Sequence, residues 1–225
     1  MKENTNQNLP DIPQYLVKNY EDLIDKIKNY QNYDIANALK MLKDIYDFID
    51  KFNKFVKTFT NCSRGCSVCC NFLVETTYLE AIYIAKKTGS SINPNNKNEK
   101  NAIILTSGNI YHPCPFLSKK KDCSIYSYRP FNCRVYHTGS NAILCHEPYK
   151  THAVYGDASK NYGVSFFIDL HSIIEKLNTN LNGNISDLRW FFFTKDFKDY
   201  LANLNSKRKQ EIDDLVAKNS KILRQ

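Results

Sequence analysis

The sequence predicts a mainly α-helical domain with an irregular, cysteine-rich, metal-binding middle section. Apolar residues recur at helical spacing near both ends of the chain, and all eight cysteines fall in the stretch from Cys62 to Cys145. Only seven glycines and seven prolines occur among 225 residues, which disfavours sandwiches and glycine-rich nucleotide loops. We therefore expect three segments packed as one domain: a helical pair over 1–60, a metal-binding unit over 61–150 and further helices over 151–225.

Two amphipathic helices are expected near the N-terminus. Apolar side chains follow one stripe from Ile12 to Tyr30 and a second stripe from Ile35 to Phe59. Asp34 is suited to cap the second helix, because its carboxylate can accept a bond from a backbone N–H. Stripes this regular are typical of core packing, so we expect an antiparallel pair that packs against later elements. The polar residues 1–10 are expected to be disordered.

More helices are expected after the first cysteine cluster. One spans Glu75 to Lys87, starting near Thr76 or Thr77 and stopping at Gly89. The section from Tyr111 to His146 is broken by prolines, which predicts irregular, cysteine-bearing turns. The remaining expected helices are Tyr162 to Leu177, Asp187 to Leu204 with Ser186 as its cap, and Glu211 to Leu223.

The composition indicates a soluble, cytoplasmic protein without a membrane partner. The first ten residues hold no apolar run like that of a signal peptide, and no stretch approaches the roughly 20 apolar residues that span a bilayer. In a reducing cytoplasm, clustered cysteines are more often metal ligands than disulfides. Residues 61–150 carry eleven Lys and Arg against five acids. This excess favours charge compensation of thiolates over nucleic-acid binding, since only Lys119 to Lys121 form a basic run.

The first four cysteines have a spacing that leaves two structural interpretations. Cys62, Cys66, Cys69 and Cys70 would share one face of a helix, so a buried cysteine stripe is one of them. Gly65 and its polar neighbours favour the other, a turn that directs backbone N–H groups at the sulfurs. The adjacent Cys69 and Cys70 could both bind one ion only with distortion, so they more easily serve two metals, or one binds a metal while the other packs or reacts. Eight cysteines then form two sets of four, which suits two zinc sites or one cluster plus a second ion.

The cysteine pattern resembles that of a known family. After Cys-x3-Cys-x2-Cys-Cys come Cys114-Pro-Phe-Leu and then Cys123-Ser-Ile-Tyr-Ser-Tyr-Arg-Pro-Phe-Asn-Cys133-Arg. Over about residues 62–146 this resembles the bacterial YkgJ-like cysteine-cluster family, which is described as zinc- or iron-chelating and of the CxxCxxCC type. The resemblance implies a site for an iron–sulfur cluster or for zinc or iron ions. Its candidate ligands are Cys62, Cys66, Cys69, Cys70, Cys114, Cys123, Cys133 and Cys145.

Two arginines within the same block are candidate cofactor-binding residues. Arg129 precedes a proline, which biases its backbone toward an extended conformation. Its guanidinium can face a thiolate, Glu75 or Glu80, and the same orientations are considered for Arg134. The alternative is that both arginines form surface ion pairs, which contribute little to stability. His112, His137 and His146 flank cysteines and are possible substitute ligands, but each is more often an ordinary hydrogen-bonded residue.

The sequence leaves the biological role open, including whether the protein is an enzyme. Cys62, Cys66 and Cys69 match the spacing of radical S-adenosylmethionine enzymes, but helices precede the motif and few strand patterns follow. Flagellin lysine N-methylases resemble the family in their cysteine motif and use S-adenosylmethionine, yet no glycine-rich methyl-donor loop is recognisable here. A third alternative is a zinc-stapled interaction module, whose helices or aromatic run from Trp190 to Phe193 would contact a protein partner.

Overall fold

The computed structural model describes residues 10–30, 34–62, 65–93, 113–138, 145, 154–155 and 164–192. Helices dominate these residues, which confirms the predicted fold class. The longer helices are α1 (Gln14–Lys28), α2 (Ile35–Val56), α3 (Tyr78–Thr88) and α5 (Val164–Asn180). The short helices are η1 (Val68–Asn71, a 3-10 helix), α4 (Phe131–Val135) and α6 (Leu188–Phe191). The strands are β1 (Glu75–Thr77), β2 (His137–Thr138), β3 (Val154–Tyr155) and β4 (Ile185–Asp187).

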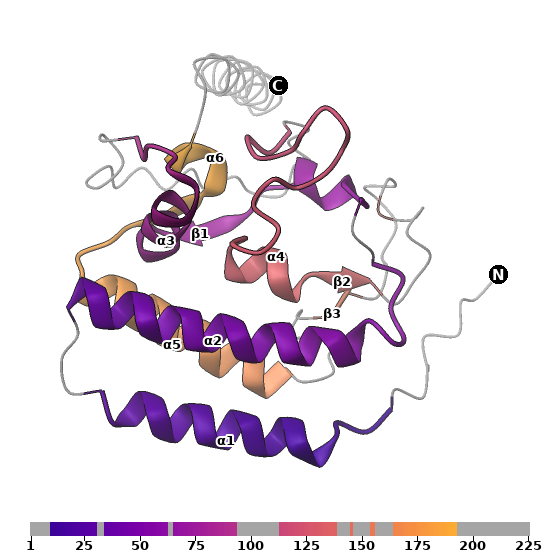
Figure 1. Ribbon diagram of the computed structural model, residues 1–225, viewed down its shortest axis with the longest axis vertical. Coiled ribbons are helices and arrows are strands. Elements are labelled where there is room, and N and C mark those ends of the chain that lie inside the picture. Colours follow the sequence, from indigo (N-terminus) through magenta and orange to yellow (C-terminus); the bar gives the residue numbers. More distant parts are fainter. Residues whose placement is uncertain are drawn as a thin grey trace, which may run out of the picture.

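The predicted N-terminal pair of helices is confirmed. The α1 and α2 helices run antiparallel, with α5 beside α2, while α4 lies on the side of α2 opposite to α1 (Figure 1). The side chain of Asp34 caps α2 as expected, accepting a 2.8 Å bond from the backbone N–H of Asn37. The apolar stripes face one another because a period near 3.6 keeps such residues on one side of each helix.

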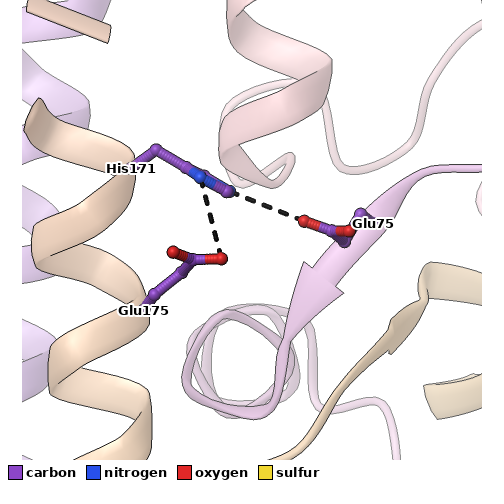
Figure 2. A group of neighbouring side chains, drawn as sticks. All are labelled: Glu75, His171 and Glu175. Carbon is purple, nitrogen blue, oxygen red and sulfur yellow. Dashed lines mark ion pairs between the residues drawn. The ribbon is translucent and has the colours of Figure 1, made fainter. Parts of the chain in front are cut away.

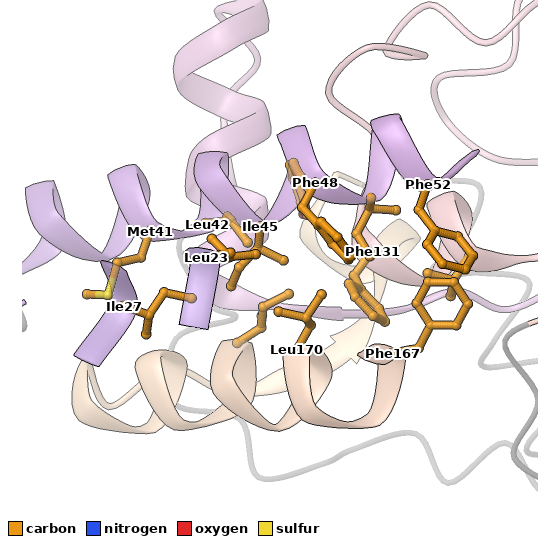
Figure 3. Packing of buried hydrophobic residues seen from close by; sticks show 14 of the residues in the cluster. Leu23, Ile27, Met41, Leu42, Ile45, Phe48, Phe52, Phe131, Phe167 and Leu170 are labelled. Atoms are coloured by element: carbon orange, nitrogen blue, oxygen red, sulfur yellow. The ribbon is translucent and has the colours of Figure 1, made fainter. Parts of the chain in front are cut away.

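One hydrophobic core joins all three segments of the chain. Figure 3 shows Leu23 and Ile27 of α1 packed against Met41, Leu42 and Ile45 of α2. Towards the other end of α2, buried rings from three helices meet, contributed by Phe48, Phe52, Phe131 and Phe167. Phe131 is the first residue of α4, so the helix that carries Cys133 is anchored directly in this core.

Two helices begin later than the predicted Glu75 and Asp187, in both cases because residues distant in sequence pair as strands, whereas Thr77 near the start of the first is confirmed. Glu75 to Thr77 form β1, which is antiparallel to β4 with Glu75 opposite Asp187. The α3 helix therefore begins at Tyr78, with Thr77 and Glu80 forming a capping box, and it ends at Gly89 with φ of 73°. Ser186 lies within β4, and Asp187 caps the short α6 in its place.

Several predictions fall on residues outside the described ranges. These are residues 1–9, the start of the helix expected at Tyr162, residues 193–204 and Glu211 to Leu223. The helix expected to end at Leu177 continues to Asn180. Within the described residues, none of the helices is long and apolar enough to cross a membrane.

Candidate metal centre

Six of the eight cysteines line one cavity of about 140 Å³. These are Cys66, Cys69, Cys70, Cys114, Cys123 and Cys133. Apolar side chains such as Phe72, Ile125 and Leu188 form much of the remaining wall, and the charged residues of the lining are Lys121 and Arg129. None of the lining residues in the described part of the chain is an Asp or a Glu. The cavity therefore combines soft sulfur ligands with positive charge.

The first cysteine cluster is a turn followed by a single 3-10 helix. Gly65 has φ of 93°, a left-handed conformation that favours glycine, and Cys69 and Cys70 lie in η1. A continuous helix with all four cysteines on one face is therefore not formed. The backbone carbonyl of Cys70 accepts a 2.8 Å bond from the N–H of Cys114, which brings the second cysteine segment against the first.

A turn between residues 114 and 124 brings Cys123 beside Cys114. Leu117 and Cys123 form an isolated antiparallel bridge, and the N–H of Ser124 donates to the Phe116 carbonyl at 2.9 Å. Both cysteines pack against a small cluster made of Ile84, Ile125 and Leu188. Cysteine-bearing turns were expected here, and their direction is set by backbone bonds and by this small apolar cluster.

Cys62 and Cys145 do not line the cavity. The sulfur of Cys62 accepts a bond from the backbone N–H of Thr138 at 3.2 Å, and the N–H of Asn61 donates to the Thr138 carbonyl at 3.2 Å. Cys145 is buried. Burial raises the pKa of Cys145, and the nearby thiols of Cys62 and Cys66 raise it further. Cys62 and Cys145 therefore interact electrostatically with Cys66 and are not part of the cavity wall.

Burial opposes ionisation of most of these thiols. It raises the pKa of Cys114 to about 12 and that of Cys133 well above its usual value. Cys70 is the exception: a bond from the Cys69 thiol lowers its pKa to about 7, with further lowering by Arg189 and Arg129. The same interaction, together with burial, raises the pKa of Cys69. Since metal ligands are thiolates, metal binding must displace protons from these buried thiols.

The thiols are more widely spaced than a single ion in an all-sulfur site requires. Among the described residues, Glu75, His171 and Glu175 form the only group of three potential ligand atoms within 4.8 Å of one another, so no three sulfurs lie that close. Tetrahedral zinc with Zn–S bonds of about 2.3 Å holds its sulfurs about 3.8 Å apart. An iron–sulfur cluster tolerates wider spacing, because its own iron and sulfide atoms lie between the cysteines.

Two ion pairs join Glu75, His171 and Glu175. Figure 2 shows the imidazole between the two carboxylates, with Nε2 at 3.7 Å from Glu75 and Nδ1 at 3.9 Å from Glu175. The carboxylates face opposite nitrogens of one ring, and one ligand atom from each of the three residues lies within 4.8 Å of the others. The side chain of Glu75 is 57% exposed. Its partner is His171, so of the three groups considered for Arg129, Glu75 is paired elsewhere.

Arg129 lines the cavity, and one nitrogen of its guanidinium is buried without a hydrogen-bond partner among the described residues. The guanidinium lies over the Tyr126 ring at 4.1 Å from the centroid, and the buried nitrogen is Nε. Its charge lowers the pKa values of Cys62, Cys70 and Cys133 against the effect of burial. A guanidinium held beside thiols is suited to compensate the negative charge of thiolates.

Arg134 does not face the thiols, which corrects the orientation considered for it. Its guanidinium is buried and donates to the Asp50 carboxylate at 2.6 Å, the Ser127 carbonyl at 2.7 Å and the Arg129 carbonyl at 2.8 Å. It also lies over the Tyr46 ring at 4.0 Å. The bonds from Arg134 fix the backbone just before α4. Arg134 thus helps to hold the helix that carries Cys133.

Glu80 also has a structural role, and among the described residues it pairs with neither Arg129 nor Arg134. The buried carboxylate accepts bonds from the Tyr46 hydroxyl at 2.8 Å, the Thr77 N–H at 2.8 Å and the Phe131 N–H at 2.7 Å. The last of these bonds satisfies the first amide of α4. Glu80 thus connects α2 and α3 to the helix that carries Cys133.

His137 is a hydrogen-bonded core residue, the interpretation favoured from sequence. Its Nε2 lies 2.9 Å from the side-chain oxygen of Asn53, and burial lowers its pKa to about 4, so the ring is neutral near pH 7. His137 is not among the residues that line the cavity. His112 and His146 lie outside the described residues.

Sequence reasoning missed Arg189 and Asp187, which hold the cysteine turn in place. The guanidinium of Arg189 donates to the Cys70 carbonyl at 2.9 Å and pairs with both carboxylate oxygens of Asp187 at 3.1 Å. Asp187 in turn accepts the Val74 N–H at 2.6 Å. Both residues are buried. The only signal in the sequence was a charged pair within an apolar run, which the surface of an ordinary helix would also produce.

A cavity walled by thiols and free of carboxylates is characteristic of cysteine-ligated metal-binding proteins, because soft ligands select zinc, copper(I) or iron–sulfur centres. Comparison with known families agrees with this class. Residues 61–153 match the family model "CxxCxxCC: Putative zinc- or iron-chelating domain", so this segment is similar to that family. No curated protein and no solved structure matches the chain.

Proposed function

We propose that this protein is a metal-binding protein whose thiol-lined cavity holds an iron–sulfur cluster. The observation that carries the proposal is a cavity of about 140 Å³ with six cysteines in its wall and no three sulfurs within 4.8 Å of one another. A polynuclear centre fits such spacing without contraction of the site. The apolar wall would limit water access, a factor that influences cluster potential and lifetime.

Arg129 is proposed to contact the bound centre. Four thiolates around a cluster or a zinc ion leave a net negative charge, and Arg129 and Lys121 are the cations of the cavity wall. The unpartnered Nε of Arg129 supports a hydrogen bond to a thiolate or sulfide of the centre. The chemistry that such a cluster supplies is one-electron transfer, and the surrounding residues hold it and adjust its potential.

A zinc-stapled interaction module is the second candidate. It is favoured by the size of the apolar cluster under the cysteine turns, which contains only three buried residues, Ile84, Ile125 and Leu188. Irregular turns with so small a core need additional cross-links, and zinc supplies these in many small domains. In this case each set of thiols would close around its ion, and the helices would bind a protein partner.

The two candidates are separated by the colour and metal content of the full chain purified without oxygen. We expect a brown protein with broad visible absorbance and matching amounts of iron and acid-labile sulfide. Exposure to air or an iron chelator should bleach it and lower the melting temperature, since metal binding contributes to folding free energy. A colourless protein with stoichiometric zinc would establish the zinc module, and a protein free of both metals would refute metal binding.

Replacement of Arg129 tests its contact with the centre. Arg129→Met should make the reduction potential of the cluster more negative, because the reduced cluster carries one more negative charge near the removed cation. Arg129→Lys should shift the potential less, since it keeps the charge but not the planar donors. Lys54→Met on the exposed face of α2 is the control. Equal potentials for Arg129→Met and the control, measured by redox titration, would show that Arg129 does not contact the centre.

A further inference from the structure

We propose that Glu75, His171 and Glu175 bind a divalent metal ion at a second site, separate from the thiol-lined cavity. One ligand atom from each of these residues lies within 4.8 Å of the other two, and none of the three lines the cavity. The ligands are one imidazole nitrogen and two carboxylate oxygens, a set that suits manganese(II), ferrous iron or zinc. The inference does not depend on the proposed cluster, because the two sites share no residue.

Two elements that are distant in sequence carry the three side chains. His171 and Glu175 are four residues apart on α5, so they project from the same face of that helix. Glu75 begins β1, whose pairing with β4 fixes its backbone, and β1 contacts α5. Figure 2 shows the two carboxylates on either side of the imidazole. The group is therefore assembled by tertiary structure and not by a sequence motif.

The imidazole of His171 is held in place by packing. Its ring lies against the Phe131 ring, with centroids 5.3 Å apart and planes inclined at 37°. Phe131 is buried, and so are Leu170 and Ile174 on either side of His171 along α5. The side chain of His171 is nevertheless 28% exposed, so an ion can reach it from solvent. A ligand that is already ordered loses less conformational entropy when the ion binds.

The charge of the group also suits a divalent cation. Within the described part of the chain, no lysine or arginine forms an ion pair with Glu75 or Glu175. Their charged partner there is His171, whose nitrogens lie 3.7 Å from Glu75 and 3.9 Å from Glu175. A metal-binding imidazole is neutral, and two carboxylates beside a neutral ring repel one another. A divalent ion between them would balance both charges.

Binding requires only a small closure of the group. Ligand atoms that lie about 2.1 Å from one ion are about 3.0–3.4 Å apart, depending on the coordination geometry. The side chains of Glu75 and Glu175 are 57% and 42% exposed, so rotation about their torsions can bring both carboxylates to one ring nitrogen. Three protein ligands leave the remaining coordination positions to water.

Manganese(II) titration of the full chain tests the site, because the electron paramagnetic resonance signal of free manganese is lost on binding. Manganese prefers oxygen and nitrogen ligands to thiolates, so the cysteines should not contribute to the signal. We expect one bound ion, which zinc should displace because zinc binds such ligands more tightly. His171→Ala, Glu75→Gln and Glu175→Gln should each weaken manganese binding by at least about tenfold. Glu21→Gln, which neutralises an exposed carboxylate on α1, is the matched control.

Equal manganese affinity in His171→Ala and the control would overturn the proposal, and so would the absence of manganese binding by the unsubstituted chain. Manganese should also raise the melting temperature of the unsubstituted chain and of Glu21→Gln, but not that of the three ligand variants. The two glutamine variants keep the side-chain volume, so they carry the test if His171→Ala does not fold. Colour and sulfide content report on the cysteines separately, so failure of the proposed function would leave this test unaffected.

Discussion

Substitution Glu80→Ala is expected to lower the free energy of unfolding by about 3–5 kcal/mol, since each buried donor left without an acceptor costs roughly 1–3 kcal/mol. The carboxylate accepts bonds from Tyr46, Thr77 and Phe131, which belong to α2, the cap of α3 and the start of α4. Alanine leaves all three donors buried and opens a small cavity. Urea denaturation of the protein as purified, without oxygen, measures the loss.

The same substitution is expected to lower metal content, because Phe131 begins the helix that carries Cys133. Glu80→Gln should have a smaller effect, since it keeps the volume and one acceptor oxygen. The control is Asp47→Ala, which removes an exposed ion pair with Lys43 one helical turn away and should change stability by no more than about 0.5 kcal/mol. Equal unfolding midpoints for Glu80→Ala and this control would contradict the role assigned to the buried carboxylate.

Arg189→Met is expected to lower the free energy of unfolding by about 3 kcal/mol, near the low end of the cost of unpairing a buried charge. The low end applies because Asp187 keeps its bonds from the backbone N–H groups of Val74 and Arg189. The lost bond to the Cys70 carbonyl should also release the turn of η1. The visible absorbance of the proposed cluster, per chain, and its rate of bleaching by a chelator measure this second effect.

The functional effect of Arg189 is separated from its effect on stability by further variants. Arg189→Lys keeps a positive charge near Cys70 but lacks the planar fork that holds both Asp187 and the carbonyl. The proposed cluster should therefore bleach faster in Arg189→Lys than in the unsubstituted protein. The double substitution Asp187→Asn with Arg189→Met should recover part of the stability and none of the resistance to bleaching. Lys176→Met on the exposed face of α5 is the control, and bleaching of Arg189→Met at the rate of this control would refute the positioning role.

The elements that were best predicted from the sequence are those that depend on residues close together along the chain. The α1 and α2 helices follow from their apolar period, and the Asp34 cap follows from a side chain three residues from its donor. The β1–β4 pairing was missed because its partners are more than a hundred residues apart and each strand has only three residues. Glu75 and Ser186 were therefore placed at helix starts by local propensity, which tertiary pairing overrode.

The candidate site was predicted in its chemistry and not in its geometry. Cysteine content and spacing indicated a thiolate-bound metal, and the family model covers the same segment. That all eight cysteines are ligands stays a prediction. The two arginines illustrate the limit: Arg129 lies at the cavity, whereas Arg134, five residues later, is buried against Asp50 and Tyr46.

By itself, the sequence determined which residue types are available for chemistry and which helices form, because ligand softness and apolar periodicity are local properties of the chain. Only the tertiary structure decided which sulfurs share a cavity, which guanidinium faces them and which carboxylates hold the supporting helices. The physical reason is that a side chain's direction depends on turns and strand pairings between distant segments. In this protein those contacts include Arg189 to Cys70 and Glu80 to Phe131.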